Sequence, residues 1–198
     1  CPYTADKARI VVQEMIDGIS LELVEKRLVT DQLVLTVGYD IENLTRPEIR
    51  KVYKGPVTTD RYGRRVPKHA HGTWNLPRAT SSSSELLEAM AALYDKIVNP
   101  ALLIRRMSLS ACHVVNEKMA KEREQKETFE QLDLFTDYAK KEAKEKEEQK
   151  KRERERRMQE ALLTIKKKYG KNAVLRGMNF EEGATAKERN GQIGGHQA

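Results

Sequence analysis

The chain has 198 residues, and its 37 Lys and Arg against 30 Asp and Glu give a formal net charge of +7. A charged fraction of 34% and a mean hydropathy of −0.73 exclude one compact core throughout, so part of the chain should lie in solvent or against a partner. Two cysteines exclude a disulfide scaffold, and no apolar run could span a bilayer, so we expect a cytoplasmic location without membrane contact. Because the sequence begins with Cys rather than Met, we interpret it as a fragment of a longer protein.

The first 39 residues predict one helix followed by one strand. Residues 5–26 place apolar side chains three or four positions apart, which is typical of a helix that buries one face. Residues 32–39 alternate between two faces, which is typical of a strand with one buried face. The side chains expected to point inward from this strand are Leu33, Leu35, Val37 and Tyr39.

The next segment, residues 40–71, shows no sustained period and contains five Gly or Pro residues, so we expect a long basic connection. Between positions 46 and 78, nine basic residues stand against two acidic ones, so this stretch carries the net charge of the whole chain. Such a cluster is typical of a polyanion-binding protein, usually one that binds nucleic acid, and the alternative is a solvated loop without a partner. The nine residues are Arg46, Arg50, Lys51, Lys54, Arg61, Arg64, Arg65, Lys68 and Arg78.

A second ordered block follows. Residues 72–81 are expected to be extended, and Pro77 places them at the edge or the end of a sheet. The Ser82-to-Glu85 segment forms a capping box for a helix that stops before Pro100. Residues 102–115 predict another strand.

These elements predict an α+β fold, in which an antiparallel β-sheet is backed by two helices on one side and followed by a charged helical extension. The opposite face of the predicted sheet is unusually polar. A polar face next to a basic segment suggests where a phosphate backbone would lie. The residues expected on this face are Gln32, Thr36, Arg106, Ser108 and Ser110.

The composition changes after position 116. From 140 to 157 there is one apolar residue, yet Glu repeatedly precedes Lys or Arg by four positions, so we predict a charged helix without a coiled-coil stripe. We therefore divide the chain into a domain at 1–116 with its basic loop at 40–71, a linker with a short motif at 117–136, a charged helix at 137–169 and a loosely structured tail at 170–198.

The linker contains a short apolar motif in charged surroundings. Leu132, Leu134 and Phe135 gain nothing by exposure to water, and so polar a segment offers them no core. The motif is therefore interpreted as a linear peptide that docks in an apolar groove of another protein, with Gln131 forming a hydrogen bond at the rim and Leu134 and Phe135 filling the pocket. The alternative is that the segment packs on its own domain.

The pentapeptide Gln131-Leu132-Asp133-Leu134-Phe135 resembles the motif by which bacterial polymerases and repair proteins bind the sliding clamp. Residues 5–115 resemble the little-finger domain of Y-family translesion DNA polymerases, above all the UmuC / ImpB-MucB-SamB-like repair polymerases of Gram-positive bacteria. The resemblance covers nearly the whole chain. The sequence segments that carry the resemblance are Thr30 to Asp40, His71-Gly72-Thr73, Leu76 to Ser81, Arg176-Gly177-Met178-Asn179 and Gly194-Gly195-His196.

The resemblance implies a four-stranded sheet backed by two helices, lying in the major groove and gripping the backbones of primer-template duplex DNA. The family's first strand should precede Ala5, where only residues 1–3 remain, and its empty place would invite pairing with another chain. The implied partners are duplex DNA and the bacterial sliding clamp, the beta subunit of DNA polymerase III. The sequence leaves open whether RecA or a UmuD-like protein also binds.

We expect no catalysis from this chain. The polymerase active site of the family needs clustered carboxylates that hold two Mg²⁺ ions, and these lie in a palm domain outside this sequence. His69 and His71 have no Cys or carboxylate set to complete a metal site, so no metal or cofactor is expected here.

Two functions therefore compete. The first is a region of a translesion polymerase, active in DNA repair and damage tolerance in the SOS response, that grips DNA without sequence specificity and binds the clamp. The second is a protein–protein adaptor whose tail recruits partners and whose basic loop is incidental. The expected DNA contacts are the nine basic residues with Arg106 and Ser108, and the expected clamp contacts are Gln131, Leu132, Asp133, Leu134 and Phe135.

Overall fold

The computed structural model describes residues 2–130, 138–193 and 196–197. The elements of the first half are α1 Ala5–Glu25, β1 Leu28–Tyr39, α2 Glu42–Thr45, α3 Pro47–Val52, β2 Val57–Thr59, β3 Arg65–Pro67, β4 Ala70–Thr80 and α4 Ser83–Ile97. Those of the second half are β5 Ile104–Cys112, β6 Val115–Asn116, α5 Glu117–Glu130, α6 Tyr138–Tyr169, the 3-10 helix η1 Gly177–Phe180, α7 Ala186–Arg189, β7 Gln192–Ile193 and β8 His196–Gln197.

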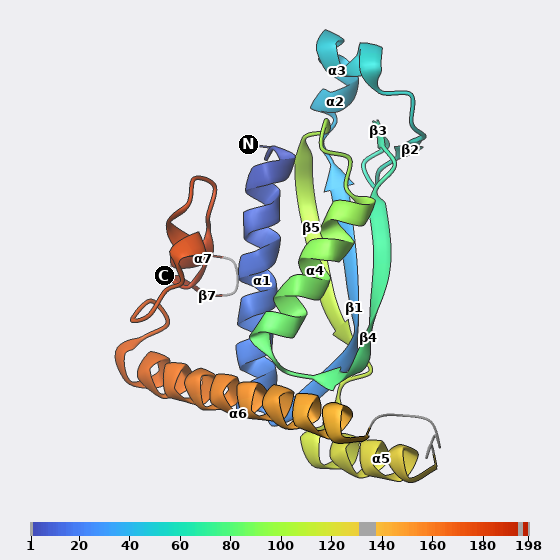
Figure 1. The fold of residues 1–198 in the computed structure, drawn as a ribbon. Helices are drawn as coiled ribbons and strands as arrows, with labels where there is room; N and C mark the ends of the chain where they lie inside the picture. Colours follow the sequence, from blue (N-terminus) through green and yellow to red (C-terminus); the bar gives the residue numbers. More distant parts are fainter. Residues whose placement is uncertain (1, 131–137, 194–195, 198) are drawn as a thin grey trace.

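The central layer is an antiparallel sheet in the order β4-β1-β5, and β6 pairs with the first residues of β1. Helices α1 and α4 lie side by side over one face of this sheet (Figure 1). The α+β class and the antiparallel sheet with helices on one side are thus confirmed. Helix α6 crosses the end of this layer at which α4 begins.

The core forms between the sheet and the two helices. Leu33, Leu35 and Val37 of β1 are fully buried, as their alternation in the sequence predicts, and they pack with side chains such as Ile16 of α1. Helix α4 comes unusually close to β4 at Gly72, where an added Cβ would lie 2.8 Å from a methyl carbon of Ile97. Any larger residue at this position would therefore force the side chains of Ile97 and Leu93 to shift.

Both edges of the sheet have particular features. Strand β4 is an edge strand, as Pro77 predicts, and its register with β1 shifts between the Thr30–Thr80 and Gln32–Asn75 pairs. Pro77 lies in this irregular stretch, where no ladder hydrogen bond requires its missing N–H. At the β5 edge, Tyr3 and Ile104 exchange two backbone hydrogen bonds of 2.8 and 2.7 Å. The residues just before α1 therefore begin to occupy the place expected for a first strand.

The basic segment is more ordered than its sequence suggests. Instead of an irregular connection over 40–71, the chain forms α2, α3 and an antiparallel ribbon of β2 and β3. Buried Asn43 holds α2 in place, because its side chain donates to the Leu103 carbonyl at 2.8 Å and accepts from the Leu103 N–H at 2.7 Å. Elements of three to six residues are too short to show a period, which is why the sequence pattern missed them.

The C-terminal part also differs from the expectation of a loosely structured tail. Residues 177–180 and 186–189 form short helices that fold back on α1. The buried carboxylate of Glu14 on α1 accepts hydrogen bonds from Asn179, Thr185 and Ala186, and it forms a 3.1 Å ion pair with Arg189. A polar contact between residues this far apart in the chain leaves no periodic signal in the sequence.

Candidate nucleic-acid interface

The sheet face opposite α1 and α4 is polar and open among the described residues. On β4 and β5 its outward side chains are exposed: His71, Thr73, Asn75, Arg106, Ser108 and Ser110. Cross-strand hydrogen bonds order this surface, from Gln32 Nε2 to Asn75 Oδ1 at 2.9 Å and between Thr36 Oγ1 and His71 Nδ1 at 2.9 Å. The face therefore presents hydroxyl, amide and guanidinium groups, which suit contacts to phosphate oxygens.

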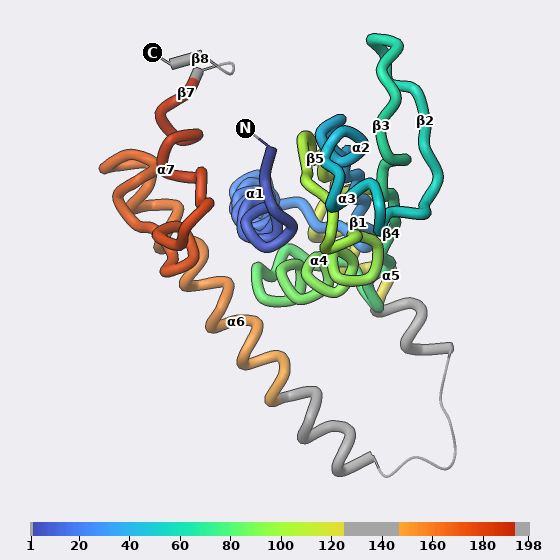
Figure 2. Tube along the Cα trace, turned by 90° about the horizontal axis from the view of Figure 1, so that it is seen from above, coloured from blue at the N-terminus to red at the C-terminus, as the bar shows by residue number. Residues whose placement is uncertain are grey.

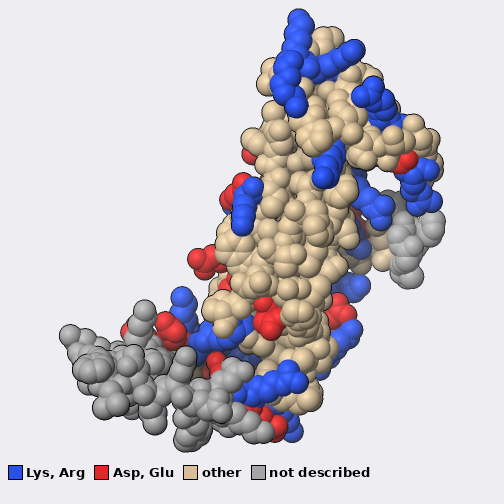
Figure 3. All heavy atoms as spheres, turned by 90° about the vertical axis from the view of Figure 1, so that its right-hand side faces the viewer, with Lys and Arg blue, Asp and Glu red and all other residues tan. Residues whose placement is uncertain are grey.

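A second surface, which we call the basic arm, comprises residues 41–69 with α2, α3 and the β2–β3 ribbon. Figure 2 shows the ribbon projecting away from α1 and α4, on the side of the open sheet face. In Figure 3, Lys and Arg side chains gather over this end of the molecule. The arm carries Arg46, Arg50, Lys51, Lys54, Arg61, Arg64, Arg65 and Lys68, all of them exposed.

Some of the predicted DNA-contacting cations are already paired with carboxylates. Arg46 Nε donates to Glu42 at 3.0 Å, and Arg64 lies 2.7 Å from Asp60. Arg78 lies at the far end of β4 from the arm and pairs with Glu85 at the start of α4. Within the described part of the chain, the remaining predicted cations have no ion pair: Arg50, Lys51, Lys54, Arg61, Arg65, Lys68 and Arg106.

The structure therefore brings most of the predicted DNA contacts together and separates one of them. Arg106 lies opposite Gly38, near the end of β1 that leads into the arm, and Ser108 lies opposite Thr36. Arg78 is apart from this group. Its pairing with Glu85 also leaves the predicted capping box half formed, because Ser82 Oγ accepts from the Glu85 N–H at 3.2 Å while the Glu85 carboxylate binds Arg78.

The ribbon tip has a defined geometry that the sequence did not reveal. Asp60 accepts hydrogen bonds from the backbone N–H groups of Tyr62 at 2.8 Å and Arg64 at 2.9 Å. The N–H of Arg64 is the main reason why the pKa of the Asp60 carboxyl is lowered. Gly63 has a φ of +78°, a conformation that favours glycine. Hydrogen bonds to the Asp60 side chain therefore hold the tip in this shape, rather than packing against the core.

An aromatic ring at this tip lies close to two cations. The side chain of Tyr62 is 69% exposed, and the guanidinium carbons of Arg61 and Arg64 each lie 5.1 Å from its ring centroid. The run Arg61-Tyr62-Gly63-Arg64-Arg65 is the only signal in the sequence that could have indicated this arrangement.

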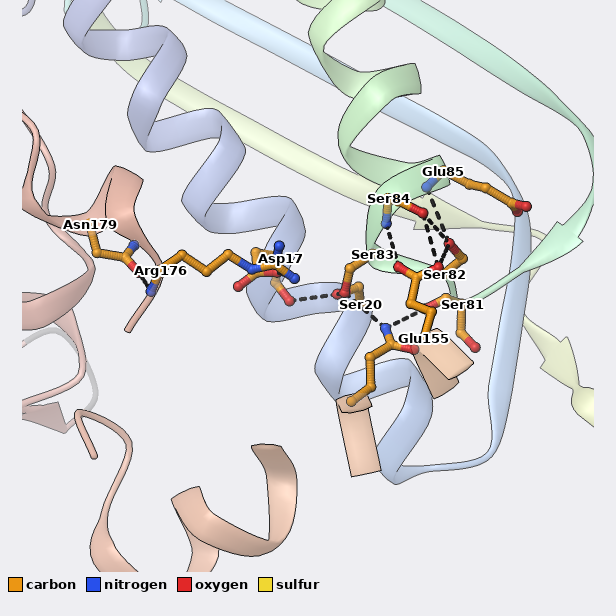
Figure 4. Close-up of polar contacts among 11 residues, drawn as sticks. Asp17, Ser20, Ser81, Ser82, Ser83, Ser84, Glu85, Glu155, Arg176 and Asn179 are labelled. Carbon is orange, nitrogen blue, oxygen red and sulfur yellow. Dashed lines mark hydrogen bonds and ion pairs between the residues drawn. The ribbon is translucent and has the colours of Figure 1, made fainter. Parts of the chain in front are cut away.

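A separate polar cluster joins α6 to the four serines before and within the first turn of α4 (Figure 4). Glu155 accepts from Ser82 Oγ at 2.6 Å and from the Ser84 N–H at 2.8 Å, which satisfies donors at the start of the helix. Gln159 is 2% exposed and donates to the Ser81 carbonyl at 3.0 Å and to Ser83 Oγ at 2.8 Å. This cluster fixes α6 to the domain and offers no free reactive group.

The cleft beside this cluster has a volume of about 1280 Å³. Side chains of both signs line it, and two of them, Arg156 and Glu117, form an ion pair of 3.2 Å across it. Over residues 2–130, 138–193 and 196–197, no group of three His, Cys, Asp or Glu side chains is placed to hold a metal ion. None of the helices in those ranges has an apolar stretch long enough to cross a membrane.

The expected clamp contacts, residues 131–135, lie outside the described residues.

Comparison of the sequence with family models and with curated proteins, and of the fold with solved structures, finds no match.

Proposed function

We propose that this chain is the non-catalytic DNA-binding and clamp-binding region of a translesion DNA polymerase that acts in DNA repair. The observation that carries the proposal is that the β2–β3 ribbon of the basic arm projects on the side of the open polar sheet face. A duplex laid on the sheet would meet cations of the arm along its phosphate backbone. On this proposal the fold is a little finger, as the sequence resemblance implies.

The binding is sequence-tolerant. Exposed Lys and Arg side chains neutralise phosphates, and phosphate contacts position a protein on DNA without reading bases. Among the predicted DNA contacts, all but one of the cations without an ion pair in the described ranges lie on the arm, so we expect the arm to supply most of the affinity. Serine and guanidinium groups of β5 add contacts to the backbone from the sheet side.

The remaining parts of the proposal rest on the sequence. The segment from Gln131 to Phe135, which follows α5 and precedes α6, binds the bacterial sliding clamp. The Mg²⁺ ions and their carboxylates belong to the palm domain of the parent DNA-directed DNA polymerase, so this chain has no cofactor. The protein acts in the bacterial cytoplasm, where RecA or a UmuD-like protein is a further candidate partner.

Salt dependence of duplex binding tests the proposal. If about five phosphates are neutralised, log K should fall with log salt with a slope of about −4.5, measured by fluorescence anisotropy on a labelled duplex. A slope indistinguishable from zero would contradict DNA binding through phosphates.

A charge-neutralised variant separates this function from the adaptor alternative. Replacing Arg61, Arg64, Arg65 and Lys68 by Gln should cause a large loss of duplex affinity and reduce the slope. A matched control removes four exposed cations from the other end of the molecule by Gln substitution at Lys150, Lys151, Arg154 and Lys171. The adaptor alternative predicts unchanged duplex affinity in the arm variant, whereas the proposal predicts that only the control retains it.

A further inference from the structure

The β2–β3 ribbon is anchored at its base and free at its tip. The Lys68 N–H donates to the Pro56 carbonyl at 2.8 Å, and the Tyr53 hydroxyl donates to the same oxygen at 2.8 Å. At the tip, the Arg64 side chain donates to Asp60 Oδ2 at 2.8 Å, in addition to the backbone contacts of that carboxylate. The tip therefore keeps its shape without any contact to the core.

The aromatic ring at this tip contributes little to the fold. The Tyr62 ring is 69% exposed, so it contributes little to burial of apolar surface. The two guanidinium groups near its centroid place positive charge beside an aromatic face. A flat ring next to cations matches the chemistry of a nucleobase next to its phosphates, since bases stack on aromatic side chains and phosphates pair with arginine.

We propose that the ribbon tip is a binding site for an unpaired base of DNA, with Tyr62 as the stacking surface and Arg61 as the main contact to the adjacent phosphate. Arg61 has this role because Arg64 is paired with Asp60, whereas Arg61 has no carboxylate partner within the described ranges. This inference rests on the proposed function and deepens it by naming the DNA feature that one part of the arm recognises.

The choice of an unpaired base follows from stacking geometry. Inside a duplex both faces of each base are covered by neighbouring bases, so an external ring has no free face on which to stack. A base that has lost its partner can swing out of the stack and offer a face. The ribbon projects on the side of the open sheet face, so a duplex held on that face would bring its distorted or single-stranded portion within reach of the tip.

The test compares two DNA molecules that differ only in one extra, unpaired nucleotide. The full chain is titrated by anisotropy against a paired duplex and against the same duplex carrying a single bulged 2-aminopurine. We expect tighter binding to the bulged DNA and quenching of 2-aminopurine fluorescence by stacking. Tyr62→Ala should remove both, with a loss of about fivefold or more for the bulged DNA and unchanged affinity for the paired duplex.

Two further variants make the result specific. Tyr62→Phe keeps the ring and should retain the preference and the quenching. Val52→Ala is the matched control, because Val52 is 73% exposed on α3 of the same arm and lacks an aromatic ring. Thermal melting of each variant monitors the fold, which an exposed side chain should not affect.

The outcomes distinguish failure of the base-binding inference from failure of the proposed DNA-binding function. If Tyr62→Ala retains the preference for bulged DNA and the quenching, the inference is overturned while duplex binding stands. If the wild-type chain binds neither DNA, the proposed function fails and the inference fails with it. Equal affinity of the wild type for both DNA molecules, without quenching, also overturns the inference alone.

Discussion

A single buried carboxylate, that of Glu14, organises the C-terminal segment of this protein. Burial by itself would raise the pKa of Glu14, but donors from Asn179, Thr185 and Ala186 and the charge of Arg189 outweigh it and lower the pKa. In the sequence, Glu14 is one more polar position in an amphipathic helix, and its partners lie at least 165 positions away. Local patterning therefore predicted the buried apolar residues of β1 and could not predict this contact.

The lowered pKa predicts a pH dependence of the docking of residues 176–190. A carboxyl whose pKa is depressed on folding adds stability above its unfolded value, here 4.5, and loses that stability as the pH falls through the folded pKa. Asp17 forms an ion pair with Arg176 and lies within the electrostatic influence of Lys166. Burial raises the pKa of its carboxyl, so Asp17 contributes to the pH dependence of stability with the opposite sign. We expect the hydrogen-exchange protection factors of 176–190, which correct for the slower intrinsic exchange in acid, to fall below pH 4.5 while those of β1 stay high.

Glu14→Gln tests the same contact at neutral pH. The substitution removes the charge that faces Arg189 and one of the two carboxylate oxygens, so we expect docking of 176–190 to weaken by about 2 kcal/mol. Hydrogen exchange at pH 7 measures this change. Glu22→Gln is the matched control on the exposed side of α1 and should leave the exchange of 176–190 unaltered. Equal protection in wild type and Glu14→Gln would show that other contacts hold the segment.

At the scale of elements, length decided what the sequence could predict. Helices α1 and α4 and strand β1 are long enough to show their periods, and the side chains predicted to point inward from β1 are buried. The helical state of α6 was indicated by Glu paired with Lys or Arg four positions later. Its place on the domain was not indicated, because it docks through polar side chains rather than through an apolar stripe. The helices and strands of the basic arm were not predicted, because they are too short to show a period.

Gln159 provides the test for the docking of α6. Replacement by Ala leaves the buried Ser81 carbonyl and Ser83 hydroxyl without this donor, so we expect a loss of about 1–3 kcal/mol in the free energy of unfolding. Urea denaturation measures the loss, and hydrogen exchange locates it at the start of α4. Gln149→Ala removes an exposed amide from the same helix and should change stability by less than about 0.5 kcal/mol. Similar effects of the two substitutions would argue against the docking described here.

At the scale of the whole molecule, the basic arm and the helices α5 and α6 are at opposite ends of the sheet. The arm lies at the end of the sheet where β1 finishes, whereas α5 and α6 lie at the opposite end. The ion pair between Glu117 of α5 and Arg156 of α6 ties the two helices together at 3.2 Å. The proposed DNA contacts and the proposed clamp contact also belong to segments far apart in the sequence. Two contacts built on distant elements should be separable by mutation.

The proposed clamp contact provides that test. Leu134→Ala combined with Phe135→Ala removes the two apolar side chains expected to fill the clamp pocket, so binding to a bacterial sliding clamp, measured by surface plasmon resonance, should be abolished. Duplex affinity and thermal stability should stay unchanged, because the DNA contacts are on the arm and the sheet. Met119→Ala, which truncates a half-exposed apolar side chain on α5, is the control and should retain clamp binding.

The reciprocal experiment uses the arm variant with Gln at Arg61, Arg64, Arg65 and Lys68. If the two contacts are independent, this variant loses duplex affinity and keeps its affinity for the clamp. The two groups of side chains are separated along the chain by β4, α4, β5, β6 and α5. Unchanged clamp binding by the Leu134→Ala, Phe135→Ala variant would refute the motif. Loss of both activities in either variant, with thermal stability unchanged, would instead mean that clamp and DNA share one surface.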